Sequence, residues 1–110
     1  MEDPDGNFIH AIMHRREPDY ANAKYWFRRV GAHPAFGPLA VAAIQFLGQQ
    51  TGDPLKRTLL PKGNWNWDPF AFVDECQECA RLPAGNLRLA TAVELQRLEF
   101  ETLLAHLCAR

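Results

Sequence analysis

The chain has 110 residues, 47% of them hydrophobic, and a formal net charge of −1. These values fit one globular domain that buries a core, and they exclude a disordered chain. So small a charge gives no general reason to bind nucleic acid, and no apolar run is long enough for a membrane span. The opening residues MEDPDGN do not resemble a secretory signal, and three Cys do not suggest a disulfide framework, so we expect a cytoplasmic protein.

The first predicted helix follows a flexible N-terminus over residues 1–6. Its apolar residues run from Phe8 to Met13 at helical spacing, so this arc should face the core. The pair Glu17-Pro18 then ends the helix, because the proline ring cannot continue the hydrogen-bond pattern.

A second helix is predicted over residues 20–30. Asp19 is a natural N-cap, since its carboxylate can accept hydrogen bonds from the free N–H groups of the first turn. Gly31 suits the position directly after the helix. The inner stripe of this helix consists of Tyr20, Ala23, Phe27 and Val30.

The middle of the chain predicts one helix, one long loop and the start of another helix. Residues 39–50 are apolar on nearly all sides and should form a central, buried helix. Residues 51–67 show no sustained period and predict a long loop, after which Asp68-Pro69 caps and begins a helix. No alternating pattern indicates strands, so residues 1–110 are predicted to form a single all-α domain, a bundle of about five helices.

The last helix is predicted to begin at the capping box Thr91-x-x-Glu94 and to end near Cys108. It has two apolar stripes, namely Val93, Phe100, Leu103, Leu104 and Leu107 on one side and Leu95, Leu98 and Thr102 on the other. Two stripes require burial on two sides, which suggests a homodimer through this helix.

Charge is distributed unevenly between the two halves of the chain. Residues 14–33 contain five Lys or Arg against two acids, whereas residues 68–101 contain seven acids against three Arg. We therefore expect the halves to attract each other, either within the fold or across a dimer.

The turn EPDY at residues 17–20 is followed by small and aromatic packing residues, Ala23, Phe27 and Val30. This pattern resembles the second half of a tetratricopeptide repeat. A repeat array needs about three units or more, and this chain has only one. The resemblance therefore implies a TPR-like N-terminal hairpin and nothing about partners.

The string HRREPDYANAKYWFRRVGAHP at residues 14–34 and the element WDPF at residues 67–70 carry a second resemblance. Similar elements occur in an uncharacterised family of bacterial proteins, and the likeness spans most of this chain. It implies a bacterial protein of unknown function, so any activity has to be argued from the side chains.

His10 and His14 are four residues apart, a spacing at which two imidazoles on one helix can share a metal ion. A third ligand would have to come from a neighbour such as His33, Glu17 or Asp19. The alternative is that these rings form hydrogen bonds within a polar seam. No HExxH pattern supports the metal, so we expect no metal and no other cofactor.

Cys76 and Cys79 also have the spacing of metal ligands, but no second pair of ligands follows them. Both lie on the apolar stripe of their helix. We therefore expect them to pack in the core as reduced thiols.

The hairpin holds more basic and aromatic residues than a purely structural element needs. Arg side chains can bind carboxylate or phosphate through two parallel hydrogen bonds, and exposed aromatic rings can stack on a ligand. The leading hypothesis is a non-catalytic binding domain for a small anionic molecule or an acidic peptide. The candidate binding residues are His10, His14, Arg15, Tyr25, Arg28, Arg29, His33, Trp65 and Trp67.

Two other functions remain open. One is a metal-assisted enzyme that uses His10 and His14 with a nearby carboxylate. The other is a structural interaction domain in which the polar side chains form internal networks. Motifs for catalytic triads, P-loops and dinucleotide binding are absent from the sequence, so no catalytic residue can be named.

Overall fold

The computed structural model describes residues 3–48 and 66–109. These residues form five helices: α1 (Pro4–Arg16), α2 (Tyr20–Val30), α3 (Phe36–Gly48), α5 (Pro69–Cys79) and α6 (Leu87–Ala109). No strand occurs among the described residues. The protein is therefore a single all-α domain, as its apolar periodicity predicts.

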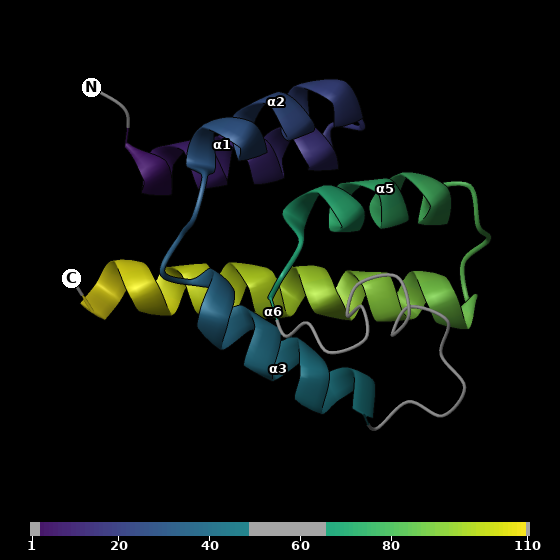
Figure 1. Ribbon diagram of the computed structural model, residues 1–110. Helices are drawn as coiled ribbons and strands as arrows, with labels where there is room; N and C mark the ends of the chain where they lie inside the picture. Colours follow the sequence, from purple (N-terminus) through teal and green to yellow (C-terminus); the bar gives the residue numbers. More distant parts are fainter. Residues whose placement is uncertain (1–2, 49–65, 110) are drawn as a thin grey trace.

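The long helix α6 lies at the centre of the bundle (Figure 1). Helix α3 packs against it on one side, while α5 and the α1–α2 hairpin lie on the other side. Two groups of buried side chains fill these interfaces. The group that joins α3, α5 and α6 includes Leu39, Leu47, Trp67, Phe72 and Leu95. The group under the hairpin includes Phe8, Ile12, Phe27, Val73 and Leu103.

The hairpin packs through the predicted inner stripe of α2. Ala23 and Phe27 are buried, and the ring of Phe27 meets the ring of Phe8 on α1 edge to face, with centroids 5.7 Å apart. Asp19 is the N-cap residue, but its carboxylate makes no capping hydrogen bond. Gly31 follows the helix with φ 65°, a left-handed conformation that favours glycine.

The predicted flexible N-terminus over residues 1–6 is wrong for the part that the structure describes. Helix α1 already begins at Pro4, and the side chain of Asp5 is buried. Asp3 caps this helix by accepting a hydrogen bond from the N–H of Asp5, at 3.1 Å. A capping Asp followed by Pro at the first helical position is itself a signal for the start of a helix. The prediction relied on the apolar residues from Phe8 onward and did not use this signal.

Helix α3 is not the central helix that its composition predicts. It begins at Phe36, and its buried stripe leaves Val41 55% exposed. Only one stripe of the helix is buried, and it consists of Leu39, Ala40, Ala43 and Leu47. The central position belongs to α6, which is long enough to contact elements on both of its sides.

Helix α6 begins one turn earlier than the predicted capping box. The Oδ1 atom of Asn86 accepts hydrogen bonds from the N–H groups of Arg88 and Leu89, at 2.9 and 3.3 Å. Thr91 lies inside the helix, where its hydroxyl donates to the carbonyl of Leu87. Asn after Gly is an equally good cap, so local pattern alone did not choose between the two starts.

The apolar arcs of α1 and α6 are only partly buried. Met13 is 55% exposed, and on α6 the side chains of Val93, Phe100 and Leu104 are 56%, 45% and 44% exposed. The predicted loop over residues 51–67 lies outside the described residues except for Asn66 and Trp67. No helix in the described ranges is long and apolar enough to cross a membrane.

Candidate functional site

A column of stacked rings occupies one face of the hairpin. The ring of Trp26 stacks on that of His10, with centroids 4.1 Å apart and 11° between the planes. His10 stacks in turn on His14, at 4.8 Å and 12°. The column forms because the two His are four residues apart on α1, and because the antiparallel packing of the hairpin brings α2 beside them.

Arg29 and Tyr25 extend this column. The guanidinium of Arg29 lies over the rings of Trp26 and Tyr25, 5.5 and 5.4 Å from their centroids. Its Nη1 atom also donates a hydrogen bond to the Tyr25 hydroxyl at 3.1 Å. We call the five residues the ring face: His10, His14, Tyr25, Trp26 and Arg29. Arg28 is exposed beside it and forms no hydrogen bond or ion pair within the described ranges.

The other end of the column is acidic. The Nδ1 atom of His14 is buried and has no hydrogen-bond partner among the described residues. The carboxylates of Glu17 and Asp19 lie 3.8 and 3.6 Å from it, which is close enough to attract a protonated ring. The face-to-face stacking of His10 and His14 directs their nitrogen lone pairs into nearly parallel planes. In this arrangement the two rings do not converge on one metal ion.

Arg15 is buried against α6 instead of joining the ring face. Its Nη1 atom donates to Oε2 of Glu99 at 3.1 Å, and its Nη2 atom donates to Oε1. The guanidinium also lies over the ring of Phe72, 4.8 Å from the centroid. Burial alone would lower the pKa of Arg15, but the charge and hydrogen bonds of Glu99 outweigh it and hold the pKa above its ordinary value.

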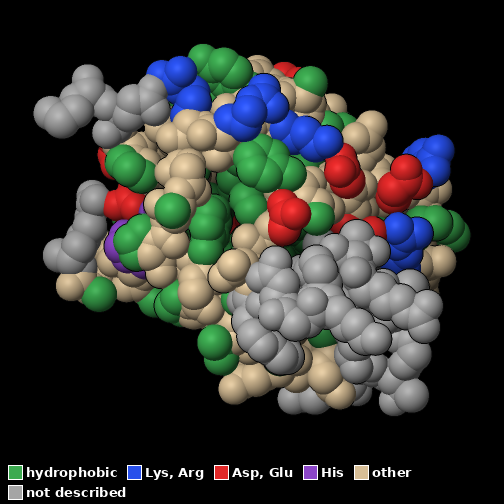
Figure 2. Space-filling view, viewed as in Figure 1, with side chains coloured by type: hydrophobic (Ala, Val, Ile, Leu, Met, Phe, Trp, Pro, Cys, Tyr) green, Lys and Arg blue, Asp and Glu red, His purple; other side chains and the backbone are tan. Residues whose placement is uncertain are grey.

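A second ion pair also joins the basic N-terminal half to the acidic C-terminal half. The Nζ atom of Lys24 on α2 lies 2.5 Å from Oδ1 of Asp74 on α5, and both side chains are partly exposed. The expected attraction between the halves therefore occurs within the fold. Figure 2 shows Lys and Arg side chains along the edge formed by the hairpin, with Asp and Glu side chains nearby.

A groove runs between α1 and α6, and Arg15 lies at its floor. One hollow of about 360 Å³ is lined by Ile12, Arg15 and Arg16 on α1 and by Val93, Gln96 and Phe100 on α6. A second hollow of about 270 Å³ shares Arg15, Arg16 and Gln96 with the first and continues toward Tyr20 and Cys76. The shared polar side chains therefore stand where the two hollows meet.

Cys76 and Cys79 are buried free thiols, as their place on the apolar stripe predicts. Burial raises the pKa of Cys76 to about 12. Burial, together with the adjacent Glu75 carboxylate, raises the pKa of Cys79 to about 12 as well. Because a thiolate is the nucleophile and the metal ligand, these two thiols are poorly suited to either role at neutral pH.

A third polar cluster joins the beginning of α1 to the end of α6. His33, which follows α2, places Nε2 2.6 Å from Oδ1 of Asp5. The Nε2 atom of His106 lies 3.2 Å from the same oxygen. One ligand atom from each of the three side chains lies within 4.8 Å of the others, so the cluster has the donor types of a divalent metal site.

Which ring nitrogen of His33 carries the proton determines whether this cluster can bind a metal ion. The backbone N–H of Ala35 donates to Nδ1 of His33 at 3.0 Å, so Nδ1 must be an acceptor. The ring proton of neutral His33 is then on Nε2 and is donated to Asp5. A metal ion would have to displace that proton, which leaves the ring without any N–H. The arrangement therefore links the start of α1 to the segment after α2 by a hydrogen bond, and the His106 ring beside Asp5 brings the end of α6 to the same point.

The predicted candidate residues are thus divided among several places. His10, His14, Tyr25 and Arg29 come together on the ring face, with Arg28 beside them. His33 does not join them, because its side chain is fully buried against Asp5. Trp67 also does not: it is 4% exposed and packs on Phe72 in the core, as a large apolar ring beside a helix start readily does. Trp65 lies outside the described residues.

Sequence reasoning did not include Trp26 of the ring face, and it missed four residues of the other clusters: Asp5, Gln96, Glu99 and His106. Asp5 was assigned to a flexible end, and the other three belong to the helix at the far end of the sequence. Arg15 and Glu99 are 84 residues apart, so no local spacing connects them. The excess of acids in the second half was the one signal that pointed toward such a partner.

The comparisons with known proteins give no match: no family model, no curated protein and no solved structure matches this chain. Function therefore has to be inferred from the arrangement of the side chains described above.

Proposed function

We propose that this protein is a non-catalytic binding domain that recognises an acidic peptide segment of a partner through the ring face and Arg28. The observation that carries the proposal is the fixed column of rings, which ends in cationic groups at the surface. Arg29 is held over two rings, and the exposed Arg28 next to it has no partner within the described ranges. A carboxylate that binds there gains charge-assisted hydrogen bonds without first displacing an acidic side chain from Arg28.

An extended peptide suits the ring face better than a small molecule does. The depression on this side is bordered by Asp19, Asn22 and Tyr25, and it is shallow. A small ligand would bury little of its surface there, whereas a peptide can distribute several weak contacts along the column. The Tyr25 side chain, 43% exposed, offers an apolar ring and a hydroxyl to such a peptide.

The experiment is fluorescence anisotropy with a fluorescein-labelled hexaglutamate peptide, and a hexalysine peptide serves as the charge control. We expect hexaglutamate to bind and hexalysine not to bind, with an affinity that falls as salt is raised, because exposed charges are screened. Arg28→Gln should weaken binding by about tenfold. Arg81→Gln removes another exposed cation, which lies just after the end of α5 and is paired with Glu78, and it should change binding less than twofold.

Equal losses for Arg28→Gln and Arg81→Gln would show that the peptide responds only to net charge, and the proposal would be wrong. The same conclusion holds if hexaglutamate fails to bind at low salt. Tyr25→Leu provides a second measurement, since it removes both the hydroxyl and the ring that hold Arg29 in place and leaves an apolar side chain.

A further inference from the structure

The groove between α1 and α6 contains polar groups that the fold leaves without partners. The Nε atom of Arg15 is buried and has no hydrogen-bond acceptor, although Nη1 and Nη2 bind Glu99. Neither Arg16 nor Gln96 forms a hydrogen bond or ion pair within the described ranges. A buried donor without an acceptor destabilises the protein, so a ligand that supplies an acceptor here gains binding free energy.

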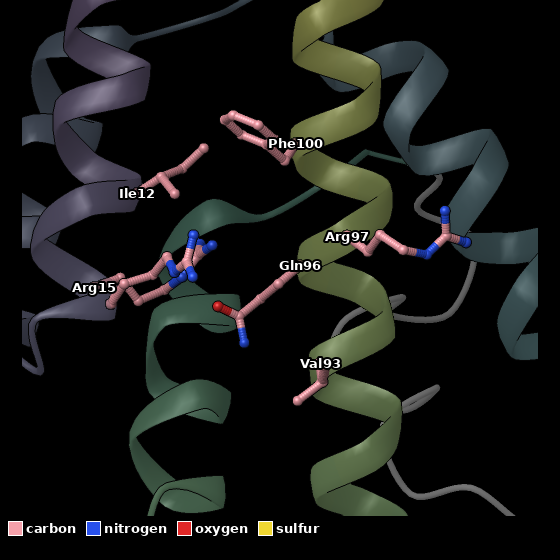
Figure 3. Close-up of a pocket in the computed structure, with 7 residues that line it drawn as sticks. Ile12, Arg15, Val93, Gln96, Arg97 and Phe100 are labelled. Carbon is pink, nitrogen blue, oxygen red and sulfur yellow. The ribbon is translucent and has the colours of Figure 1, made fainter.

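The walls of the groove are apolar on one side of these groups. Figure 3 shows Ile12 on α1 and Phe100 on α6 pointing toward each other across the groove, next to Arg15 and Gln96. Val93 and Phe100 are 56% and 45% exposed, which is high for large apolar side chains that line a hollow. Covering them removes apolar surface from water, and this favours a ligand with an apolar body.

Among the described residues, the charged side chains around the groove leave one positive charge that no acidic side chain compensates. Arg15 is neutralised by Glu99. Arg97 points away from α1 in Figure 3 and is paired with Glu94 and Glu101. Arg16 therefore remains as the one cation without a partner among the described lining residues. A single Arg with two neutral donors matches a monoanion better than a doubly charged phosphate.

We propose that this groove binds an aliphatic monocarboxylate, with the carboxylate at Arg16, Gln96 and the Arg15 Nε–H, and with the hydrocarbon chain on Ile12, Val93 and Phe100. The hollow of about 360 Å³ has the size of a small-molecule site. The site is separate from the ring face and does not depend on the function proposed for that face.

Isothermal titration calorimetry with sodium butanoate, hexanoate and octanoate, each below its micelle concentration, tests the proposal. The dissociation constant should fall by about two- to fourfold for each added methylene, because each one buries apolar surface in the groove. Octanamide, which is neutral, should bind at least about tenfold more weakly than octanoate, and octylammonium should not bind. Equal affinity for octanoate and octanamide, or no binding of octanoate at millimolar concentration, would overturn the proposal.

Two pairs of matched variants locate the site. Arg16→Gln should weaken octanoate binding by about tenfold, whereas Arg81→Gln should change it less than twofold. Val93→Glu places a carboxylate on the apolar wall and should weaken binding by about tenfold as well. Val41→Glu is its control, because Val41 is equally exposed, at 55%, on α3. All four side chains are exposed, so circular dichroism should show unchanged helix content.

Methyl NMR and light scattering cover the remaining outcomes. Octanoate should shift the methyl signals of Ile12 and Val93 and leave those of Val41 unchanged; the reverse pattern would overturn the site. If light scattering shows a dimer that Val93→Glu dissociates, a second copy of the chain fills the groove and the proposal is wrong. Because hexaglutamate has no long aliphatic tail and its test uses Arg28→Gln, failure of either proposal can be recognised without the other.

Discussion

The two faces of the first hairpin satisfy their polar side chains in different ways. On the ring face the stacking and hydrogen bonds described above join residues of the hairpin itself, such as the Arg29–Tyr25 hydrogen bond between residues four apart. On the face toward α6, Arg15 binds Glu99 across 84 residues of sequence. The ring face can therefore form as soon as α1 and α2 pair, whereas the floor of the groove exists only after α6 has docked.

The same difference applies to energy. The ring face is largely exposed, and contacts between exposed groups contribute little to stability because water competes with them. Arg15 and Glu99 are buried, so the loss of one partner leaves a charge without compensation in the core. Substitutions on the ring face should therefore leave the protein folded, whereas the loss of one partner of the Arg15–Glu99 pair should lower its stability strongly.

The largest effect should come from the packing that supports both faces. Phe27→Ala removes a fully buried ring that meets Phe8, and we expect a loss of about 3–5 kcal/mol in the free energy of unfolding. Urea denaturation followed by circular dichroism measures it. Val41→Ala, at an exposed position of α3, is the control and should cost less than about 1 kcal/mol. A loss below about 1 kcal/mol for Phe27→Ala would contradict the hairpin packing.

The second effect tests the buried ion pair. Arg15→Met should cost about 3 kcal/mol, because it leaves the Glu99 carboxylate buried without a partner. The double variant Arg15→Met with Glu99→Leu should recover most of that loss, since two apolar side chains of similar size need no compensation. If the double variant is less stable than Arg15→Met, the two residues do not act as a pair.

These two cases also show what the sequence could and could not predict. The inner stripe of α2 follows from helical periodicity, so Ala23 and Phe27 could be assigned to the core from spacing alone. The stacking of His10 on His14 likewise follows from residues four apart on one helix. The partner of Arg15 could not be predicted, because it depends on the register in which α6 docks. The start of α6 was itself misplaced by one turn.

The burial of single polar residues was hardest to predict. His33 and Asp5 were counted as a surface ligand and as part of a flexible end, yet both are buried against each other. Polar residues are mostly exposed in proteins, and the prediction assumed the same for these two. That assumption is wrong wherever two polar side chains bury each other through a hydrogen bond. Only the three-dimensional contact between the start of α1 and the segment after α2 shows the pair.

A smaller effect is expected on the ring face. Trp26→Leu keeps an apolar side chain but removes the stacking on His10 and the ring under Arg29. We expect a loss of about 1 kcal/mol, within the range measured for aromatic pairs. Chemical denaturation of Trp26→Leu and of His10→Ala, with the double variant, measures the coupling. Fully additive losses would mean that the stacking contributes nothing to stability.

The smallest effect should come from the exposed counterpart of the buried ion pair. Lys24→Met breaks the contact with Asp74, whose side chains are 34% and 59% exposed, so we expect a loss of at most about 0.5–1 kcal/mol. Salt should reduce this loss, because ions screen exposed charges, whereas the loss for Arg15→Met should change little in the same series. Asp74→Asn is the matched variant and should give the same salt dependence. Suppose instead that Lys24→Met lowers the free energy of unfolding by more than about 2 kcal/mol and that salt does not change this loss. The Lys24–Asp74 pair would then be as protected from water as Arg15 and Glu99 are. The energetic distinction between the exposed and buried sides of the hairpin would be wrong.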